Sequence, residues 1–231
     1  MPEIAFQGES MSMTFRSPCD AGQYDRVLQA KKLPESNLSY DWHTGSYTLE
    51  APARYARLFG LEPPRPNRDP LPYFPGLLDR QEFAVNQALS AKRFAVWYDT
   101  GLGKTLIELE FARQVAHITG GRVLMLAPLD VIPQTCEEAE TFYGRFPIEV
   151  LAGRDDMKKW CKSGAPGIAL TNHQKFIPRD GEDFIPELQY LAGVVLDESS
   201  ILKTGGGKIK WAMLKSCKGV DYKLSCTDTP A

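Results

Sequence analysis

Beyond residue 76, short apolar runs alternate with segments of helical pattern. Each run ends in small or polar residues, which is typical of parallel strands covered by helices on both faces. In such sheets ligands bind beyond the carboxyl ends of the strands, so we expect the functional residues directly after the runs. The runs are RFAVWY (93–98), RVLMLAP (122–128), IEVLAG (148–153), GIALTN (167–172), AGVVLD (192–197) and YKLSC (222–226).

The segments between these runs predict helices. Residues 105–121 place Ile107, Phe111, Val115 and Ile118 on one face and end in two glycines, as an amphipathic helix does. A second helical pattern covers residues 133–144. The region therefore predicts an α/β fold with a mostly parallel sheet.

The sequence before this region predicts a small α+β unit over residues 1–60. Helical spacing covers 24–33, alternation around His43-Thr44-Gly45 predicts a hairpin within 38–52, and 51–60 predicts a short helix that Gly60 closes. Residues 61–76 are rich in proline, which favours extended backbone, and predict a connector. The main domain is then expected over 77–231.

Composition narrows the class of protein. The 231 residues carry a formal net charge of −2, which neither indicates nor excludes a nucleic-acid-binding surface. The apolar segments are too short for a membrane span, and the amino terminus lacks the features of a secretory signal. Five scattered cysteines without a C-x-x-C pair predict reduced thiols, and the isolated histidines argue against a zinc site. We expect a cytoplasmic protein without membrane contact.

The stretch WYDTGLGKT (97–105) has the features of a phosphate-binding loop. Such a loop needs glycines that let backbone N–H groups converge on an anion, and a helix amino terminus behind them. Lys104 is expected at the β- and γ-phosphates, and the Thr105 hydroxyl at Mg²⁺. Thr100, Gly101, Leu102 and Gly103 complete the predicted nucleotide contacts. A plain glycine turn with a surface lysine is the alternative interpretation of this stretch alone.

A second polar pair, Asp197-Glu198, ends the run AGVVLD. Two adjacent carboxylates at a strand end repel each other unless a cation is bound. With Mg²⁺ and ATP, Asp197 is expected to hold the metal and Glu198 to orient and polarise the attacking water. Both sites in the right order favour an ATP-hydrolysing enzyme with Lys104, Asp197 and Glu198 as catalytic residues over a chance glycine turn and a surface acidic turn.

The motifs DTGLGKT, VLMLAPLDVIPQ, IALTNHQKF, VVLDESSILK and YKLSCTDTPA occur in this order from residue 99 to 231. They resemble motifs I, Ia, Ib, II and III of superfamily 2 DEAD/DEAH-box helicases, in the branch related to chromatin-remodelling translocases and in a form common in bacteria and phages. The resemblance covers about Leu78 to Ala231. It implies a RecA-like P-loop NTPase lobe that uses ATP and Mg²⁺ to move along DNA, with RNA not excluded.

The resemblance also assigns roles outside the phosphate loop. Gln81, beside Arg80, matches the glutamine that reads the adenine edge through its amide. Pro128 and Leu129 after one strand, and Thr171 and Asn172 after another, match turns that touch the nucleic-acid backbone, and His173 is a further candidate there. Each of these has a turn-forming or surface alternative. Thr227 and Thr229 match the segment that couples ATP to nucleic acid.

A lysine-rich segment follows motif II: Lys203, Lys208, Lys210, Lys215 and Lys218. Lys203 and Lys208 are the residues most expected to contact the nucleic-acid backbone, with binding that weakens as salt rises. A solvated helix face is the alternative. Trp211, within the segment, is expected in the core rather than as a platform for base stacking.

Two residues depart from the family pattern. Tyr98 occupies the position of the first loop glycine, which superfamily 2 proteins often lack. Asp228 stands where the family has a small residue between the threonines of motif III. A carboxylate about 6 Å from another negative charge costs roughly 3 kcal/mol at an effective dielectric constant of ~20. We therefore expect Asp228 to point to solvent or to have a raised pKa, and to lower ATP turnover relative to Asp228→Ala.

The family's motors need a second RecA-like lobe with an arginine finger, and no counterpart follows motif III in this sequence. We therefore expect an incomplete motor lobe that binds nucleotide weakly and hydrolyses it slowly. The alternative is a non-catalytic module that binds nucleotide or nucleic acid. A third interpretation, a small-molecule kinase, has no recognisable acceptor site in the sequence.

Overall fold

The computed structural model describes residues 3–7, 10–16, 20–33, 35–61, 68–144, 147–163, 166–177, 184–203 and 207–228, and only the backbone of Arg54, Arg57, Leu58 and Lys203. The chain divides into two compact units. The amino-terminal unit comprises Met1–Asn67 and Lys162–Gly164, and the larger unit, here called the parallel lobe, comprises Arg68–Cys161 and Ala165–Ala231. Each is described by itself.

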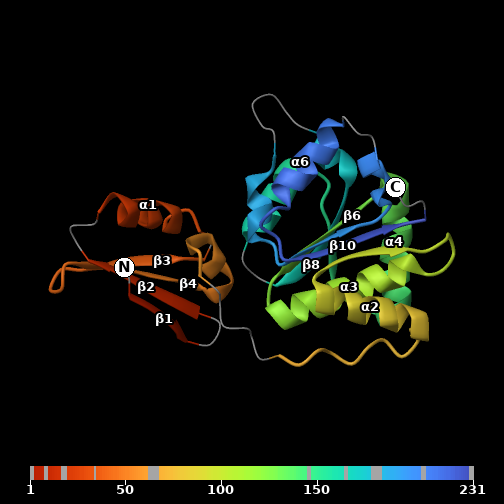
Figure 1. The fold of residues 1–231 in the computed structure, drawn as a ribbon, viewed down its shortest axis with the longest axis horizontal. Coiled ribbons are helices and arrows are strands. Elements are labelled where there is room, and N and C mark those ends of the chain that lie inside the picture. Colours follow the sequence, from red (N-terminus) through yellow and green to blue (C-terminus); the bar gives the residue numbers. More distant parts are fainter. Residues whose placement is uncertain are drawn as a thin grey trace. The chain divides into compact units, whose positions relative to one another are not determined.

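The amino-terminal unit is a four-stranded antiparallel sheet of order β1-β2-β4-β3. Its elements are β1 (Glu3–Gln7), β2 (Ser10–Arg16), α1 (Ala21–Ala30), β3 (Asn37–Asp41), β4 (Ser46–Pro52) and the 3₁₀ helix η1 (Ala53–Phe59). Met11, Met13 and Phe15 of β2 are buried at every second position, because one face of the sheet is covered. Helix α1 lies along the sheet (Figure 1).

The predicted hairpin is confirmed, with Asp41 paired to Ser46 and Gly45 at a φ of +63°. Helix α1 begins three residues before the predicted helix, because the Asp20 side chain accepts a hydrogen bond from the Gln23 amide (2.7 Å) and caps it earlier. Strands β1 and β2 were not predicted from the sequence, since β2 mixes methionines with serines and has Thr14 as its one β-branched residue.

The parallel lobe contains a six-stranded sheet of order β5-β10-β9-β6-β8-β7, and every pairing between these strands is parallel. All six apolar runs form strands as predicted. The elements are α2 (Asp79–Ala91), β5 (Arg93–Trp97), α3 (Lys104–Thr119), β6 (Arg122–Ala127), η2 (Leu129–Val131), α4 (Ile132–Tyr143), β7 (Ile148–Val150), α5 (Arg154–Lys162), β8 (Gly167–Asn172), η3 (His173–Phe176), η4 (Pro186–Tyr190), β9 (Gly193–Leu196), η5 (Ser199–Lys203), α6 (Lys208–Ser216) and β10 (Tyr222–Thr227).

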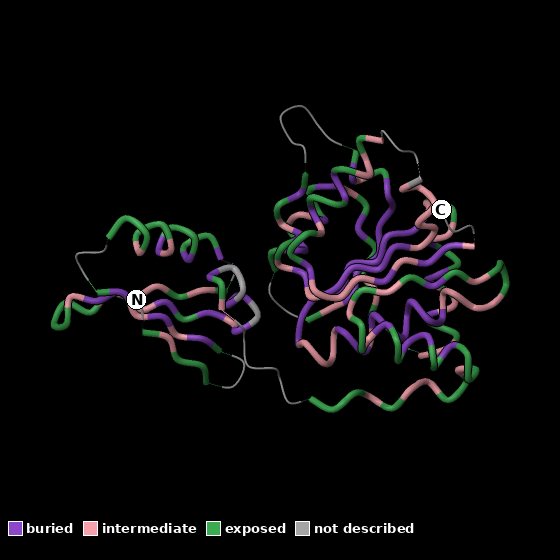
Figure 2. Tube along the Cα trace, in the orientation of Figure 1, coloured by how far each residue is buried: buried purple, intermediate pink, exposed green. Residues whose placement is uncertain are grey.

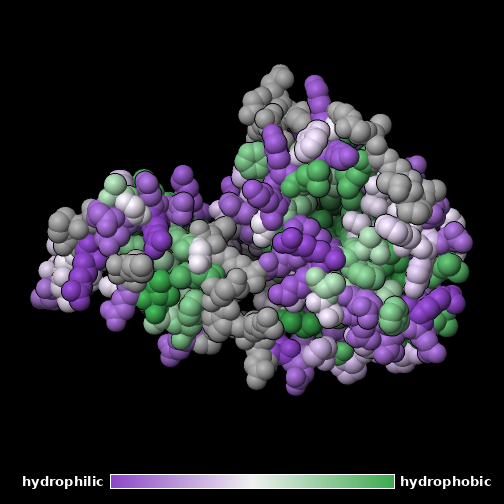
Figure 3. All heavy atoms as spheres, in the orientation of Figure 1, coloured by the Kyte–Doolittle hydropathy of each residue, from purple (hydrophilic) through white to green (hydrophobic). Residues whose placement is uncertain are grey.

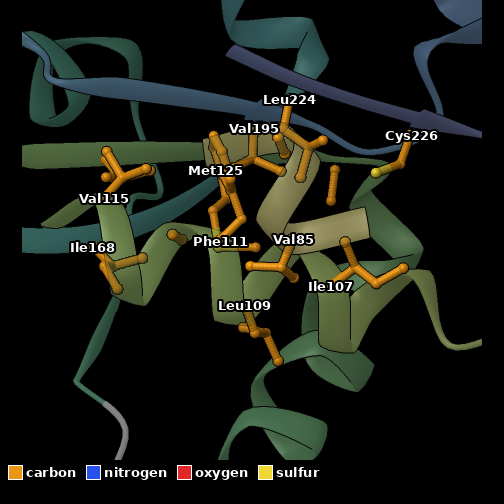
Figure 4. Close-up of a cluster of buried hydrophobic side chains, with 14 of the residues drawn as sticks. Val85, Ile107, Leu109, Phe111, Val115, Met125, Ile168, Val195, Leu224 and Cys226 are labelled. Carbon is orange, nitrogen blue, oxygen red and sulfur yellow. The ribbon is translucent and has the colours of Figure 1, made fainter. Parts of the chain in front are cut away.

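Helices cover both faces of this sheet, which confirms the predicted fold class. In β6, Val123 and Met125 pack with residues of α2, α3 and α4, whereas Leu124 and Leu126 pack with residues of α5, η4 and α6. Figure 4 shows the first of these clusters, in which Val85, Ile107, Phe111 and Met125 contribute. The inner strands β6, β8 and β9 are consequently buried along nearly their whole length (Figure 2).

The sequence predicts one buried face for helix α3, but residues outside that face are buried as well. Ile107, Phe111 and Val115 are buried as predicted, but Glu108 and Glu110 are buried too. On the face of the molecule in Figure 3, hydrophilic and hydrophobic residues both reach the surface. Among the described residues, no helix has the length and apolar character needed to cross a lipid bilayer.

Candidate functional site

Polar loops follow the carboxyl ends of four strands of the parallel sheet. β5 leads into residues 98–103, β8 into His173, β9 into Asp197-Glu198 and β10 into Asp228. Because the strands are parallel, these loops emerge at one edge of the sheet, where the sequence predicts the functional residues.

Residues 98–103, here called the phosphate loop, end at the amino terminus of α3. Gly101 and Gly103 have φ values of +81° and +73°, in the left-handed region that favours glycine. The Lys104 ammonium donates to the carbonyl oxygens of Tyr98 (2.8 Å) and Asp99 (3.4 Å). The lysine is therefore held by the loop's own carbonyls, next to the unpaired amides that begin a helix.

Gln81 of α2 binds the backbone of the phosphate loop. Its side chain is buried, its Nε2 donates to the carbonyls of Leu102 (3.4 Å) and Gly103 (3.3 Å), and its Oε1 accepts from the Leu78 amide (2.9 Å). A Cβ atom on Gly103 would collide with this Nε2. The amide that was predicted to read adenine is thus engaged at both ends within the lobe. Its role toward adenine stays a prediction.

The acidic turn Asp197-Glu198 is held from several sides. The Asp197 amide donates to Leu126 O (2.8 Å), and Asp197 Oδ1 accepts from the Glu198 amide (2.8 Å). Glu198 has a φ of +50°, which is uncommon for a residue with a side chain. Its Oε1 accepts hydrogen bonds from the hydroxyls of Ser200 and Thr227, the latter at 3.1 Å. The turn therefore fixes the Glu198 carboxylate in one orientation.

The charges of this turn interact with those of α3. Burial raises the pKa of Asp197, and the Glu198 carboxylate adds to the rise, whereas Lys104 is close enough to act in the opposite direction. The structure thus brings the lysine after the phosphate loop and the acidic turn together.

Glu108, one helical turn after Lys104, is a member of this site that the sequence analysis missed. It is 2% exposed, and burial together with the neighbouring Asp197 carboxylate raises its pKa well above the ordinary value. Its Oε1 is buried without a hydrogen-bond partner among the described residues. The signal that could have identified it is a glutamate among the apolar residues 106–112, a segment that also contains Glu110.

Asp228 faces the phosphate loop and does not point away from it, contrary to one of the two expectations. Its Oδ2 accepts a hydrogen bond from the Thr100 hydroxyl at 3.0 Å. Thr227, before it, is buried and bonded to Glu198 as described above. Thr229 lies outside the described residues.

The residues predicted to contact nucleic acid differ in how they are placed. Leu129 is 58% exposed and Pro128 is half-buried. Thr171 is fully buried and donates to Leu151 O (2.9 Å), and Asn172, also buried, accepts from the Gln174 amide (3.0 Å). The last two side chains are engaged within the lobe, and nucleic-acid binding by all four stays a prediction.

His173 is buried and its Nε2 lies 2.9 Å from the carbonyl oxygen of Asp197. Burial lowers the pKa of this imidazole, which favours the neutral ring. In this structure His173 therefore links the turn after β8 to the acidic turn and is directed inward, away from any external phosphate.

The lysine-rich segment forms helix α6 and its flanks. Lys208, Lys215 and Lys218 are exposed, Lys210 is half-buried, and Lys203 ends η5 with its side chain outside the description. Trp211 is 56% exposed, so the expectation that it lies in the core is wrong. The helix buries Ala212, Met213 and Ser216 instead. Trp211 lies outside this buried face of the helix.

The sequence of residues 79–226 matches the DEAD/DEAH box helicase family. The chain belongs to this family. The matching residues run from α2 to β10 and include the phosphate loop and the acidic turn, so the predicted family is confirmed for the parallel lobe.

Two solved structures are similar to this helicase-family chain, and the first of them supports the same fold. The Sulfolobus solfataricus SWI2/SNF2 ATPase core in complex with dsDNA gives a TM-score of 0.50 at 22% identity, over 71% of this chain and 34% of that one. A nuclease-deletion mutant of the Type ISP restriction-modification enzyme LlaGI, in complex with a DNA substrate mimic, gives 0.45 at 16% identity, over 67% and 17%. This chain thus spans about a third of the first and a sixth of the second. No curated protein matches its sequence.

The site of this helicase-family lobe fits Mg²⁺ held together with a nucleotide. Mg²⁺ usually keeps several waters and takes one or two carboxylates plus substrate phosphates. Within the described part of the chain, no three His, Cys, Asp or Glu side chains form a complete metal site. Asp197, whose environment disfavours an isolated negative charge, and the Thr105 hydroxyl in the first turn of α3 suit this sparse coordination.

Proposed function

We propose that the parallel lobe is the ATP-binding motor lobe of a cytoplasmic DNA helicase or translocase that hydrolyses ATP to ADP and phosphate. The observation that carries this proposal is that the phosphate loop with Lys104 and the acidic turn with Asp197 follow parallel strands and lie at one edge of the sheet, where the Lys104 charge lowers the pKa of Asp197. A cation behind a glycine loop and a carboxylate opposite it are what binding of a metal–triphosphate complex requires.

Each residue of the site has a role in this reaction. The phosphate loop and the amino terminus of α3 bind the phosphates, and Lys104 leaves the Tyr98 and Asp99 carbonyls to neutralise them. Glu198, oriented by Ser200 and Thr227, positions the water that attacks the γ-phosphorus as the bond to ADP breaks. Gln81 holds the loop carbonyls in place.

Thr105 and Asp197 would hold the Mg²⁺ ion, which supplies positive charge to the phosphate oxygens when it is bound. Burial raises the pKa of Asp197, and a bound cation would offset this by favouring the ionised carboxylate.

We further propose that DNA lies along the turns after β6 and β8 and the exposed lysines of α6. Exposed Leu129 and Lys208 support this path, as does the dsDNA bound to the similar SWI2/SNF2 ATPase core. A second RecA-like lobe is the proposed partner that completes the ATP site.

Nucleotide binding by Lys104→Ala tests the proposal. We expect the affinity for Mg²⁺·ADP and for a non-hydrolysable ATP analogue to fall at least about tenfold, which corresponds to 1.4 kcal/mol. Lys159→Ala, which removes the same charge from the exposed surface of α5, is the matched control and should leave the affinity unchanged. Equal binding by wild type and Lys104→Ala would contradict the proposal.

Glu198→Gln separates catalysis from binding. It should bind nucleotide as wild type does and lose whatever ATP hydrolysis the wild-type chain shows, with and without duplex DNA. Equal hydrolysis by wild type and Glu198→Gln would remove Glu198 from the mechanism. Nucleotide binding without hydrolysis in the wild type would favour the non-catalytic binding module.

A further inference from the structure

The hydrogen bond between Thr100 and Asp228 joins two segments that lie 128 residues apart in the chain. Thr100 belongs to the phosphate loop, and Asp228 follows the last described strand, β10. Both side chains reach the surface at least in part, so solvent and small ligands have access to this bond. An anionic group is therefore held at the loop that is proposed to bind anions.

A carboxylate in this place resembles the ligand of the loop in charge and in hydrogen-bonding capacity. Its oxygen accepts a hydrogen bond from a loop hydroxyl, as a phosphate oxygen does. Nucleotide phosphates that enter the loop meet this negative charge, and the repulsion grows with the charge of the nucleotide.

The loop is also closed on itself near the same place. The Leu102 amide donates to Asp99 O (3.3 Å), and the Lys104 ammonium binds the Tyr98 and Asp99 carbonyls. Thr100 lies between these contacts, so a bond from its hydroxyl to Asp228 helps to hold this closed form.

We infer that the Asp228 carboxylate and the nucleotide phosphates compete for the phosphate loop, and that the Thr100–Asp228 bond breaks when nucleotide binds. The inference rests on the proposed phosphate binding by this loop. It makes Asp228 a residue that sets nucleotide affinity and the preference between nucleotides of different charge. It also gives a physical cause for the expectation that Asp228 lowers ATP turnover relative to Asp228→Ala.

Three substitutions separate the charge from the hydrogen bond. Asp228→Asn removes the charge and keeps an oxygen that accepts from Thr100, whereas Asp228→Ala removes both. Thr100→Val removes the bond and keeps the charge. Asp130→Asn, an exposed carboxylate after β6 at the same edge of the sheet, is the control for a change in overall charge.

Affinities for adenosine, ADP and a non-hydrolysable ATP analogue are measured for each full-length variant, in the absence and presence of Mg²⁺. In Asp228→Asn and Asp228→Ala we expect the ATP analogue to bind about tenfold more tightly, ADP to gain less and adenosine to be unaffected. In the Thr100→Val background the effect of Asp228→Asn should fall to about threefold, because the carboxylate is no longer held at the loop. Urea unfolding of each variant verifies that it is folded.

An unchanged affinity in both Asp228 variants overturns the inference, and so does an equal gain with and without the Thr100 hydroxyl. An equal gain for adenosine also overturns it, since adenosine carries no phosphate. Lys104→Ala distinguishes this failure from that of the proposed function. If Lys104→Ala binds the ATP analogue as wild type does, the loop does not bind phosphate at all, whatever Asp228 does.

Discussion

Two glutamates of helix α3, Glu108 and Glu110, are both buried but lie in opposite surroundings. Glu110 accepts hydrogen bonds from Arg113 (2.6 and 3.2 Å), Gln114 (2.8 Å) and Tyr143 (2.7 Å). Glu108 has one oxygen without a partner among the described residues and is close to a second carboxyl, that of Asp197. Glu110 thus contributes to the packing of the lobe, whereas Glu108 lies at the candidate site.

The surroundings of Glu110 explain why its burial is tolerated. The charge of Arg113 balances that of Glu110, and both Arg113 and Gln114 continue to the segment before α2, where they bind Pro72 O (2.6 Å) and Leu71 O (2.8 Å). A buried carboxylate with a full set of donors is stable when its partners remain. Glu110 therefore attaches residues 71–72 to the helix.

Glu108 is compensated less, because burial and the Asp197 carboxyl raise its pKa more than the Cys226 thiol and Lys104 lower it. A buried carboxyl group with an unpartnered oxygen destabilises the folded chain, and its raised pKa reflects that environment. It lies where the proposed Mg²⁺ and phosphates bind, opposite Asp197 and near Lys104. Unfavourable burial of this kind is found at functional sites more often than in a framework.

The largest expected effect is that of Glu110→Gln on stability. The substitution removes the negative charge to which Arg113 and Tyr143 donate hydrogen bonds. Breaking a buried ion pair such as Glu110–Arg113 costs about 3 kcal/mol. Urea unfolding followed by circular dichroism measures the loss, and Glu137→Gln on the exposed surface of α4 is the control, expected within about 0.5 kcal/mol of wild type. A loss no larger than that of the control would mean that Glu110 is not a framework residue.

The sequence predicted the parallel sheet, the phosphate loop and the acidic turn. It did not predict the different surroundings of Glu108 and Glu110. Apolar runs identify strands such as β6 and β9 because each buries nearly all its residues. The phosphate loop and the acidic turn follow from residue types at fixed spacing. Periodicity cannot show that Glu110 has partners from residues 113, 114 and 143, because those contacts depend on tertiary packing. The same holds for Gln81 against the phosphate loop.

The bond between Thr100 and Asp228 shows the same limit. The sequence marked Asp228 as unusual from its position in motif III, yet its direction depends on how β5 and β10 are paired. Parallel pairing of Thr227 with Trp97 brings the two loops together, and neither strand alone contains that information.

The pH dependence of the unfolding free energy tests whether Glu108 differs from Glu110 in the way described. Because folding raises the pKa of Glu108, the folded chain keeps a proton that the unfolded chain loses above its ordinary pKa of 4.5. The contribution is fully present below that pH and is lost as pH rises toward the pKa in the folded chain. Glu108→Gln should therefore flatten the fall in unfolding free energy above pH 4.5, by up to about 1.4 kcal/mol per pH unit.

Unfolding free energies of wild type and Glu108→Gln from pH 4.5 to 8 measure this effect. Asp197, whose pKa burial also raises, contributes with the same sign and is coupled to Glu108, so the difference between the two proteins reports on this pair of carboxyl groups. Glu137→Gln is the control and should reproduce the wild-type slope. Parallel curves for Glu108→Gln and wild type would show that Glu108 is ionised in the folded chain and would end the contrast with Glu110.

The smallest expected effect concerns a single donor of the Glu110 network. Tyr143→Phe removes the hydroxyl that donates to Glu110 Oε2 and leaves Arg113 and Gln114 in place, so we expect a loss of about 1 to 2 kcal/mol in urea unfolding. Tyr73→Phe removes a hydroxyl that donates to the neutral, exposed Asn86 side chain and should cost less. In the Glu110→Gln background the loss from Tyr143→Phe should shrink, because the charge that strengthened the bond is gone. An undiminished loss would show that the Tyr143 hydroxyl stabilises the chain through a partner other than the Glu110 charge, and the network around Glu110 would then reduce to Arg113 and Gln114.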